Sequence, residues 1–447
     1  MKKSNYHKGN TEWYLEAFRN FENRLNGQTA SDLHKLRKKA LQSFEDLGFP
    51  TTRHEEWKYT NVSPLLDQNF EISEPYQPGL LSKDKVNEFK FTDLEDQTLV
   101  FVNGHFAAEL SDSSAIPGEI EILSLQDAFK KNPDRFSEHF TKLAEVSDQS
   151  FISLNTAFVQ DGTYINIPQN FKLEKPIHLI YLSFADSKPV VSFPRNLIIA
   201  GNSSEVSVIE SFVSLGSGSY FSNAVSEIVL HENAKVERIK IQNESEQAFH
   251  IAALQARQAR DSRFIDHNIS LGSAITRNDI NSEFKGENGY CELNGMYSGN
   301  HDQLLDNHTT IDHAVAHCDS NELYKGILDD KSAGVFNGKI YVRPDAQKTN
   351  AIQSNNCILL SDQATIDTKP QLEIFADDVK CTHGATIGQL NEDAYFYMRT
   401  RGIEKANARK LLIYAFASEV VDKIRHEPVR QRILDMFSDK LHTIKPE

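Results

Sequence analysis

Apolar residues recur at three- and four-residue steps near the beginning of the chain, over residues 12–47. This period predicts helices that turn one face toward a core, and Gly48 ends the pattern. A second helical pattern covers residues 404–424, and its central part, 411–417, is apolar nearly all round. We expect both sides of that helix to be covered by protein. A last helix is predicted to begin near Pro428, an acceptable first-turn residue.

Between these helical ends the pattern changes to short strands, with one helical interlude near residues 125–143 and a turn at Asn103-Gly104. The clearest strand signals lie at residues 98–102, 164–167, 177–184, 196–200, 206–213, 221–230, 236–242 and 249–256. More strands follow at intervals of roughly 10–14 residues. A sandwich, a barrel and a β-solenoid all have such spacing. Because the strands are many, short and polar on one face, we favour a β-solenoid, although no strict repeat motif is present.

The pattern divides the chain into three parts. Residues 1–95 form an N-terminal helical region and linker, residues 96–388 form the β-rich core, and residues 389–447 form a C-terminal helical domain. The linker contains the polar segment RHEEWKYT, in which Trp57 and Tyr59 are aromatic residues of the kind that is usually buried. We expect these two rings to pin the linker to the rest of the protein.

Composition narrows the range of partners and compartments. Asp and Glu number 63 against 48 Lys and Arg, a formal net charge of -15, which disfavours binding to nucleic acid or to an anionic membrane. The four cysteines are far apart in sequence with no CxxC spacing, as is typical of a reducing compartment. The N-terminus has no apolar segment of a signal peptide, and no run approaches the roughly 18 apolar residues of a membrane helix. We therefore expect a cytoplasmic protein.

The sharpest candidate chemistry is the pair Cys381 and His383. Residues 371–380 alternate as a strand, and two residues that are two apart in an extended chain point the same way. Gly384 and Gly388 are expected to loosen the backbone just after the pair. A thiol and an imidazole on one side form half of a soft-metal site, whereas zinc sites and iron–sulfur clusters usually take four ligands. The other ligands would come from elsewhere in the fold or from another chain; the alternative is a buried cysteine beside a hydrogen-bonded histidine.

A second group is rich in histidine. It comprises His301, His308, His313, His317 and Cys318. The spacing is not that of a helical HExxH metal site, and the segment is predicted to be extended. We expect histidines on a solvated strand face that form hydrogen bonds, while metal binding stays open as the alternative.

Two further patterns are weaker candidates for enzymatic chemistry than the Cys381–His383 pair. The segment from Gly334 to Ile340 has three residues between its glycines where a phosphate loop has four, and it ends on Ile where Mg²⁺ needs Ser or Thr. We reject it as an ATP site. The many Asp residues on strands are compatible with a carbohydrate-active β-helix enzyme, but sequence alone does not reveal a pair of carboxylates at a defined separation.

A short helix is predicted after the Cys381–His383 pair. Asn391 is a suitable N-cap. Arg399 and Arg401 lie near the helix end, ahead of Gly402, where cations complement the helix dipole.

Long stretches of the chain resemble the SufB/SufD family of iron–sulfur cluster assembly proteins. They are residues 306–351 (DNHTTIDHAVAHCDSNELYKGILDDKSAGVFNGKIYVRPDAQKTNA), 359–390 and the tail 396–424 (FYMRTRGIEKANARKLLIYAFASEVVDKI). Within the family, RHEEWKYT at residues 53–60 and CTHGATIG at residues 381–388 are more similar to the SufD branch than to the SufB branch.

The resemblance implies a right-handed parallel β-helix with helical regions at both ends. It also implies a non-catalytic scaffold subunit in a cytoplasmic SufBCD-type complex, which pairs with a SufB-like subunit and docks a SufC-like ATPase. A transient iron–sulfur cluster would be shared with the SufB-like partner, with no ATP site in this chain. His383 matches the family's functional histidine at the subunit interface, and Cys381 matches the cysteine beside it.

The resemblance extends to the docking segment and leaves alternatives open. The candidate residues for ATPase docking are Glu392, Tyr395, Arg399, Arg401 and Gly402. Kinship within the family also makes a homodimer of the isolated chain plausible. Within the family the alternative is a SufB-like chain that accepts sulfur on its cysteines. The sequence assigns no residue to a flavin and does not specify the type of cluster.

Overall fold

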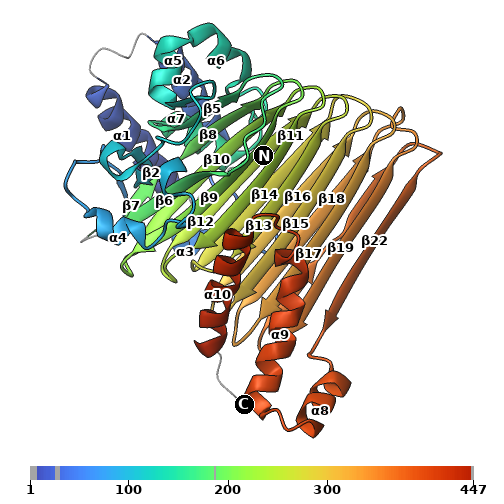
Figure 1. Cartoon of the computed structure of the whole chain (residues 1–447). Coiled ribbons are helices and arrows are strands. Elements are labelled where there is room, and N and C mark those ends of the chain that lie inside the picture. Colours follow the sequence, from blue (N-terminus) through green and yellow to red (C-terminus); the bar gives the residue numbers. More distant parts are fainter. Residues whose placement is uncertain (1–7, 26–30, 186–187, 444–447) are drawn as a thin grey trace.

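The computed structural model describes residues 8–25, 31–185 and 188–443, and it shows a parallel β-solenoid of about 8 turns with helices at both ends (Figure 1). The predicted mainly-β fold is therefore confirmed. The domain limits 1–95, 96–388 and 389–447 stay predictions, and the outer two parts include residues 1–7 and 444–447, outside the described part of the chain.

Two sheets form the walls of the solenoid. The 12-stranded sheet contains β1 (Glu71–Ile72), β4 (Glu121–Ser124), β5 (Gly162–Ile167), β7 (Val190–Ser192), β8 (Arg195–Ala200), β10 (Tyr220–Leu230), β12 (Phe249–Gln258), β14 (Ile275–Phe284), β16 (Leu304–His313), β18 (Ala333–Val342), β20 (Thr365–Thr368) and β21 (Gln371–Ile374). The 10-stranded sheet contains β2 (Thr98–Val102), β3 (His105–Phe106), β6 (Ile177–Phe184), β9 (Glu205–Leu215), β11 (Lys235–Asn243), β13 (Arg263–Ser270), β15 (Tyr290–Gly299), β17 (Asp319–Leu328), β19 (Asn350–Leu359) and β22 (Lys380–Gly388). From β8 to β19 the chain alternates between the sheets, so each turn adds a parallel strand to each wall.

Helices lie before, between and after the strands. The N-terminal part has α1 (Lys8–Arg24), α2 (Asp32–Leu47), α3 (Ser63–Leu66), α4 (Lys83–Asn87), α5 (Leu125–Lys131), α6 (Pro133–His139), α7 (Ser150–Phe158) and short 3₁₀ helices at Glu55–Trp57, Glu95–Gln97 and Ala108–Leu110. The C-terminal part has α8 (Glu392–Thr400), α9 (Lys405–Val421) and α10 (Glu427–Thr443). Within the described ranges no helix is both long enough and apolar enough to cross a membrane.

Most of the elements predicted from the sequence are present. The helical patterns at residues 12–47, 125–143 and 404–424 correspond to α1–α2, α5–α6 and α9, whereas α7 was not predicted. The hairpin between β2 and β3 turns at Asn103 and Gly104, whose φ angles are 48° and 82°. Positive φ at both central residues is the requirement of a tight hairpin turn, and Asn-Gly satisfies it.

The single strand predicted over residues 371–380 is wrong. β21 ends at Ile374 in the 12-stranded sheet, and β22 begins at Lys380 in the 10-stranded sheet. The chain crosses between the walls here, and the apolar alternation that suggested one strand arises because Leu372 and Ala376 pack in the same small cluster. Alternation alone does not distinguish a strand from a corner that is packed on one side.

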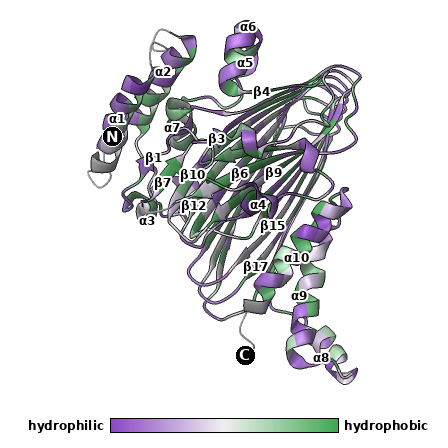
Figure 2. Ribbon diagram, turned by 60° about the vertical axis from the view of Figure 1, so that its left-hand side comes forward, coloured by the Kyte–Doolittle hydropathy of each residue, from purple (hydrophilic) through white to green (hydrophobic). Residues whose placement is uncertain are grey.

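The terminal helices cover the outer faces of opposite walls (Figure 2). On the 12-stranded sheet, Phe221 and Phe249 pack with α7 and with the aromatic residues of α1 and α2. On the 10-stranded sheet, a row of apolar residues that includes Ile239 and Ile269 packs against α9 and α10, where Ile413, Ala417 and Ile433 are buried. The strands cover one side of α9, but Leu411 is 48% exposed on another, so cover of both sides stays a prediction that needs a partner chain.

The interior between the walls contains charged residues as well as apolar ones. In β11, Ile239 faces outward under the C-terminal helices, whereas Arg238 faces inward and is 3% exposed. The Arg238 guanidinium donates to Glu210 at 2.6 Å and to Asp266 at 2.7 Å. Burial raises the pKa of Glu210, but the charge and hydrogen bonds of Arg238 more than offset that effect, so the pKa is lowered overall. The polar side chains on this face of β11 are therefore buried between the walls.

Candidate functional site

The last strand, β22, lies at a free edge of the 10-stranded sheet (Figure 1). Among the described residues it pairs only with β19, and nearly all of its residues are exposed. An edge strand presents a row of unpaired N–H and C=O groups to which another chain can add a strand. The structure therefore leaves this end of the solenoid open to a partner.

The register of β22 on β19 fixes where Cys381 and His383 point. Cys381 is opposite Ala351, and His383 is opposite Gln353. Gln353 is fully buried between the walls, and register neighbours on adjacent strands point to the same side of a sheet. Cys381 and His383 therefore share the interior face of β22, at the end of the solenoid where no further strand of the described chain covers them. Gly384 and Gly388 lie inside β22, so the expected loosening of the backbone there is wrong.

The two candidate ligands differ in accessibility. His383 is exposed and forms no side-chain hydrogen bond with any described residue. Cys381 is half-buried against the cluster that contains Ala351 and Ala376, and burial raises the pKa of its thiol. At neutral pH the imidazole is the better placed of the two to bind a metal, because the thiolate is the metal-binding form of cysteine.

Over the described residues, no group of three or more His, Cys, Asp or Glu side chains is arranged to hold a metal ion. Cys381 and His383 thus form at most half a site. The histidine-rich group does not complete it.

The histidine-rich group is dispersed. His313 is buried inside the solenoid next to Ser320, and burial lowers its pKa to about 3, whereas His308 lies on the outer side of the 12-stranded sheet. His301 and His317 are exposed in turns between strands. The expectation of a solvated histidine face is therefore wrong for His308 and His313, because the inner face of β16 is buried between the walls and its outer face is covered by the linker at His308.

The predicted helix α8 begins as expected. Asn391 Oδ1 accepts the backbone N–H of Ala394 at 2.9 Å, which is a helix N-cap. At the other end, Arg399 donates to the carbonyl of Ile403 at 2.6 Å, and Arg401 donates to the hydroxyl of Tyr397 at 2.9 Å. Both guanidinium groups therefore support the local structure of the segment.

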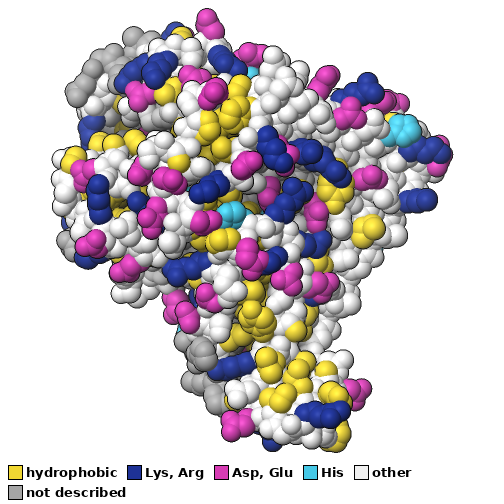
Figure 3. All heavy atoms as spheres, viewed as in Figure 1, with side chains coloured by type: hydrophobic (Ala, Val, Ile, Leu, Met, Phe, Trp, Pro, Cys, Tyr) yellow, Lys and Arg dark blue, Asp and Glu magenta, His cyan; other side chains and the backbone are white. Residues whose placement is uncertain are grey.

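The remaining docking candidates surround an apolar surface that the sequence did not reveal. Glu392 is exposed, Tyr395 is half-buried, and Gly402 ends the segment with a φ of 83°. Beside them Phe396 is 70% exposed and Tyr397 is 58% exposed. Figure 3 shows apolar side chains gathered over α8 and α9 at the lower end of this face. Large exposed apolar residues close together are typical of protein–protein interfaces.

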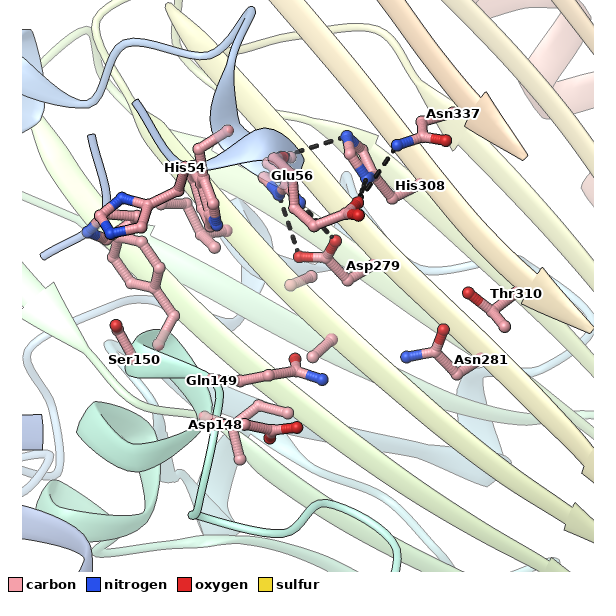
Figure 4. Close-up of a pocket in the computed structure, with 18 of the residues that line it drawn as sticks. His54, Glu56, Asp148, Gln149, Ser150, Asp279, Asn281, His308, Thr310 and Asn337 are labelled. Carbon is pink, nitrogen blue, oxygen red and sulfur yellow. Dashed lines mark hydrogen bonds and ion pairs between the residues drawn. The ribbon is translucent and has the colours of Figure 1, made fainter. Parts of the chain in front are cut away.

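The linker segment RHEEWKYT is held to the solenoid mainly by charge (Figure 4). Glu56 lies 3.4 Å from Nδ1 of His308, and Asp306 lies 3.0 Å from its Nε2. Arg277 donates to the Glu56 carbonyl and to Asp306, both at 2.7 Å. We call Glu56, Arg277, Asp306 and His308 the linker clamp. The Trp57 ring stacks on the Arg277 guanidinium at 3.8 Å, so this ring holds the linker to the solenoid as expected. Tyr59 is 42% exposed, so the expectation that it also holds the linker is wrong.

The linker clamp shifts the pKa values of His308 and Asp306 in opposite directions. Burial alone would lower the pKa of His308, but the charge of Asp306 and the hydrogen bonds to Asp306 and Glu56 together outweigh burial and raise the pKa to about 9. Burial opposes the ionisation of Asp306, yet His308 and Arg277 lower its pKa to about 2. His308 is therefore a cation and Asp306 an anion at neutral pH.

A cleft of about 650 Å³ lies beside the linker clamp, between the linker, the start of α7 and the outer face of the 12-stranded sheet (Figure 4). Asp279 in its wall is held by Arg277 at 2.8 Å. Asn337 and Lys339, also in the wall, belong to β18. The Gly334–Ile340 segment is thus part of the extended strand β18.

Comparison with known proteins identifies the protein family of this chain. The family model of the "SUF system FeS cluster assembly, SufBD core domain" matches residues 183–416, and the "SufBD protein N-terminal region" matches residues 8–179. An iron–sulfur cluster assembly SufBD family protein of Synechocystis sp. is 34% identical over 93% of this chain and 92% of its own length. The iron–sulfur cluster assembly protein SufD of Escherichia coli is 33% identical over 90% of this chain and 91% of its own length.

A SufD protein of Bacillus subtilis is more distant, at 27% identity over 92% of this chain and 94% of its own length. The two family models together cover both the solenoid and the N-terminal helices. The chain belongs to the SufB/SufD family of iron–sulfur cluster assembly proteins, as its sequence motifs suggested.

Proposed function

We propose that this chain is a non-catalytic scaffold subunit of a SufBCD-type complex in the cytoplasm, on which iron–sulfur clusters are assembled. The free edge of β22 pairs with a SufB-like subunit, and the nascent cluster is bound between the two chains. The observation that carries the proposal is the half-site of His383 and Cys381 on an open edge strand. Two ligands on such an edge become a complete site only when a second chain supplies the others.

His383 is the principal ligand on this side of the interface, with Cys381 as its neighbour. The ring of His383 is exposed, whereas burial keeps Cys381 largely protonated at neutral pH. The cluster is cargo that is built and passed on, so an accessible site at a subunit interface suits it better than a closed one. In the isolated chain the same edge can pair with a second copy, which gives a homodimer.

The helix α8 docks the SufC-like ATPase. Phe396 and Tyr397 supply the apolar contact, since both are more than half exposed. Glu392, Tyr395, Arg399, Arg401 and Gly402 shape the segment around them. ATP is bound by that partner and not by this chain.

The SufB-like alternative predicts a reactive thiol. Cys291, Cys318 and Cys357 are buried, and burial raises the pKa of all three. Buried thiols with raised pKa values are poor nucleophiles, so they favour the SufD-like role. Transfer of persulfide sulfur to this chain alone would reverse that preference. A carbohydrate-active enzyme is disfavoured, because Arg277 already pairs with Asp279, one of the carboxylates in the cleft.

Substitution of Ile387 by lysine tests the edge pairing. Ile387 lies on β22 and is 49% exposed. A lysine at this position should greatly reduce co-purification of the SufB-like subunit. Lysine residues on the edge strands of natural proteins prevent another strand from pairing there. Leu80→Lys is the matched control, since Leu80 is 53% exposed in the N-terminal region. Equal recovery of the partner by both variants would contradict the proposed pairing.

Truncation of Phe396 tests the docking helix. Phe396→Ala is expected to weaken binding of the SufC-like ATPase by about 2 kcal/mol, as is common for an aromatic interface anchor. The affinity is measured by calorimetry with the purified ATPase. Phe375→Ala, at another exposed aromatic residue outside α8, serves as control because Phe375 is 56% exposed. The docking assignment fails when both variants bind like wild type.

A further inference from the structure

Three polar side chains form one row across the last three strands of the 10-stranded sheet. Glu322 on β17 is opposite Gln353 on β19, and Gln353 is opposite His383 on β22. Glu322 and Gln353 are fully buried, whereas His383 is exposed at the end of the row. The row therefore connects the interior of the solenoid to the candidate cluster ligand.

The buried part of the row is fixed in one orientation. Gln353 Nε2 donates to Glu322 Oε2 at 2.8 Å. On the opposite wall, a Cβ added at Gly338 would lie 2.4 Å from Gln353 Nε2, so the glycine makes room for this amide. Because the amide nitrogen of Gln353 donates to Glu322, the amide oxygen points away from Glu322.

That oxygen has no partner. Gln353 Oε1 is buried and accepts no hydrogen bond from any residue that the structure describes. An unsatisfied buried acceptor is costly, and each such atom in a native protein calls for a reason. The next side chain along the row is the imidazole of His383, which itself has no hydrogen-bond partner within the described residues.

We propose that Gln353 is the positioning residue for His383: its Oε1 accepts one ring N–H of His383, so that the other ring nitrogen faces the cluster as an unprotonated ligand. This inference rests on the proposed function, in which His383 binds the cluster. Metal-binding histidines almost always donate their second ring N–H to an acceptor, which fixes the tautomer and the ring orientation. Glu322 acts one step further back, by holding the Gln353 amide.

The arrangement is specific to His383. The register neighbour of Cys381 is Ala351, which offers no side-chain hydrogen-bonding atom. The same strand pair thus supports the imidazole and leaves the thiol without such support. This difference explains why only one of the two candidate ligands needs a buried polar row behind it.

The test uses the complex co-expressed with its SufB-like and SufC-like partners and purified without oxygen. Gln353→Met removes the acceptor at nearly constant shape, and Glu322→Gln keeps an acceptor for the Gln353 amide. We expect Gln353→Met to retain iron against a ferrous chelator 10–100-fold less well than wild type, which is the usual effect of losing the partner of a ligating histidine. Glu322→Gln should stay close to wild type.

Pulsed electron paramagnetic resonance of the reduced complex, with ¹⁵N-labelled histidine, gives a second readout. We expect the nitrogen coupling of wild type to persist in Glu322→Gln and to change or vanish in Gln353→Met. If Gln353→Met fails to fold, as judged by far-UV circular dichroism, Glu322→Leu releases the same amide from its other side and should give the same change.

Unchanged iron retention and unchanged nitrogen coupling in a folded Gln353 or Glu322→Leu variant would overturn the positioning role. His383→Ala separates this failure from that of the proposed function. If His383→Ala loses the cluster while Gln353→Met keeps it, only the positioning role is wrong. If His383→Ala also keeps the cluster, the proposed function itself is wrong.

Discussion

Arg238→Met is expected to lower the free energy of unfolding by about 3–5 kcal/mol, the usual effect of removing one partner from a buried ion pair. The Arg238 side chain is 4% exposed, and its partners Glu210 and Asp266 are fully buried. Without the guanidinium both buried carboxylates would lose the ion pair that Arg238 forms with them. The shift is measured as the midpoint of urea unfolding, followed by far-UV circular dichroism.

Arg343→Met is the matched control for this prediction. Arg343 contacts Asp312 at 2.5 Å, but its side chain is 45% exposed. Pairs of this kind contribute about 0–1 kcal/mol, so the unfolding midpoint should hardly move. Equal shifts for the two arginines would show that the interior charges do not stabilise the solenoid as a network.

Raising the pH through 9 is expected to remove about 3 kcal/mol of stability through the linker clamp, since the pKa of His308 rises from 6.5 to about 9 on folding. A group whose pKa is raised on folding stabilises fully below its unfolded pKa, and that contribution is lost as the pH rises through the folded pKa. The loss should therefore begin near pH 6.5 and be complete above pH 9. The groups that face His308 are Asp306, Arg277 and Glu56, and Asp306 ionises far below this range.

The measurement compares urea midpoints of wild type and His308→Gln between pH 6 and pH 10. The midpoint of the variant should change less with pH, so the two curves approach one another at the alkaline end. His317→Gln serves as control because His317 is an exposed turn residue, and its curve should follow wild type. Parallel curves for wild type and His308→Gln would contradict the clamp.

Local patterns predict the strands well because each strand of the solenoid is a short, regular unit. β2 and β6 have the bounds that their strand signals suggested, and the Asn103-Gly104 turn follows from the φ angles that only such residues adopt easily. Alternation does not say which face of a strand is inside, however. Arg238 faces the interior and Ile239 faces the helices, an assignment that depends on helices almost two hundred residues away in the sequence.

One part of the candidate site can be predicted from local sequence, and the other part depends on tertiary packing. That Cys381 and His383 share a face follows from their spacing, which needs no more than a strand. The role of Gln353 depends on the register of β22 on β19, and the linker clamp joins Glu56 to His308 across most of the chain. Such contacts are properties of tertiary packing, and a single sequence does not contain a local signal for them.

The most direct measurement is the iron and sulfide content of the complex co-expressed with its SufB-like and SufC-like partners, purified without oxygen, in wild type and in His383→Ala. Co-purification of all three subunits is checked first, so that a loss of cluster is not a loss of assembly. Cys381→Ala is the matched comparison on the same face of β22. We expect His383→Ala to lose most of its iron and sulfide, with a smaller effect of Cys381→Ala. Unchanged iron and sulfide in an intact His383→Ala complex would contradict a cluster site at the edge of β22.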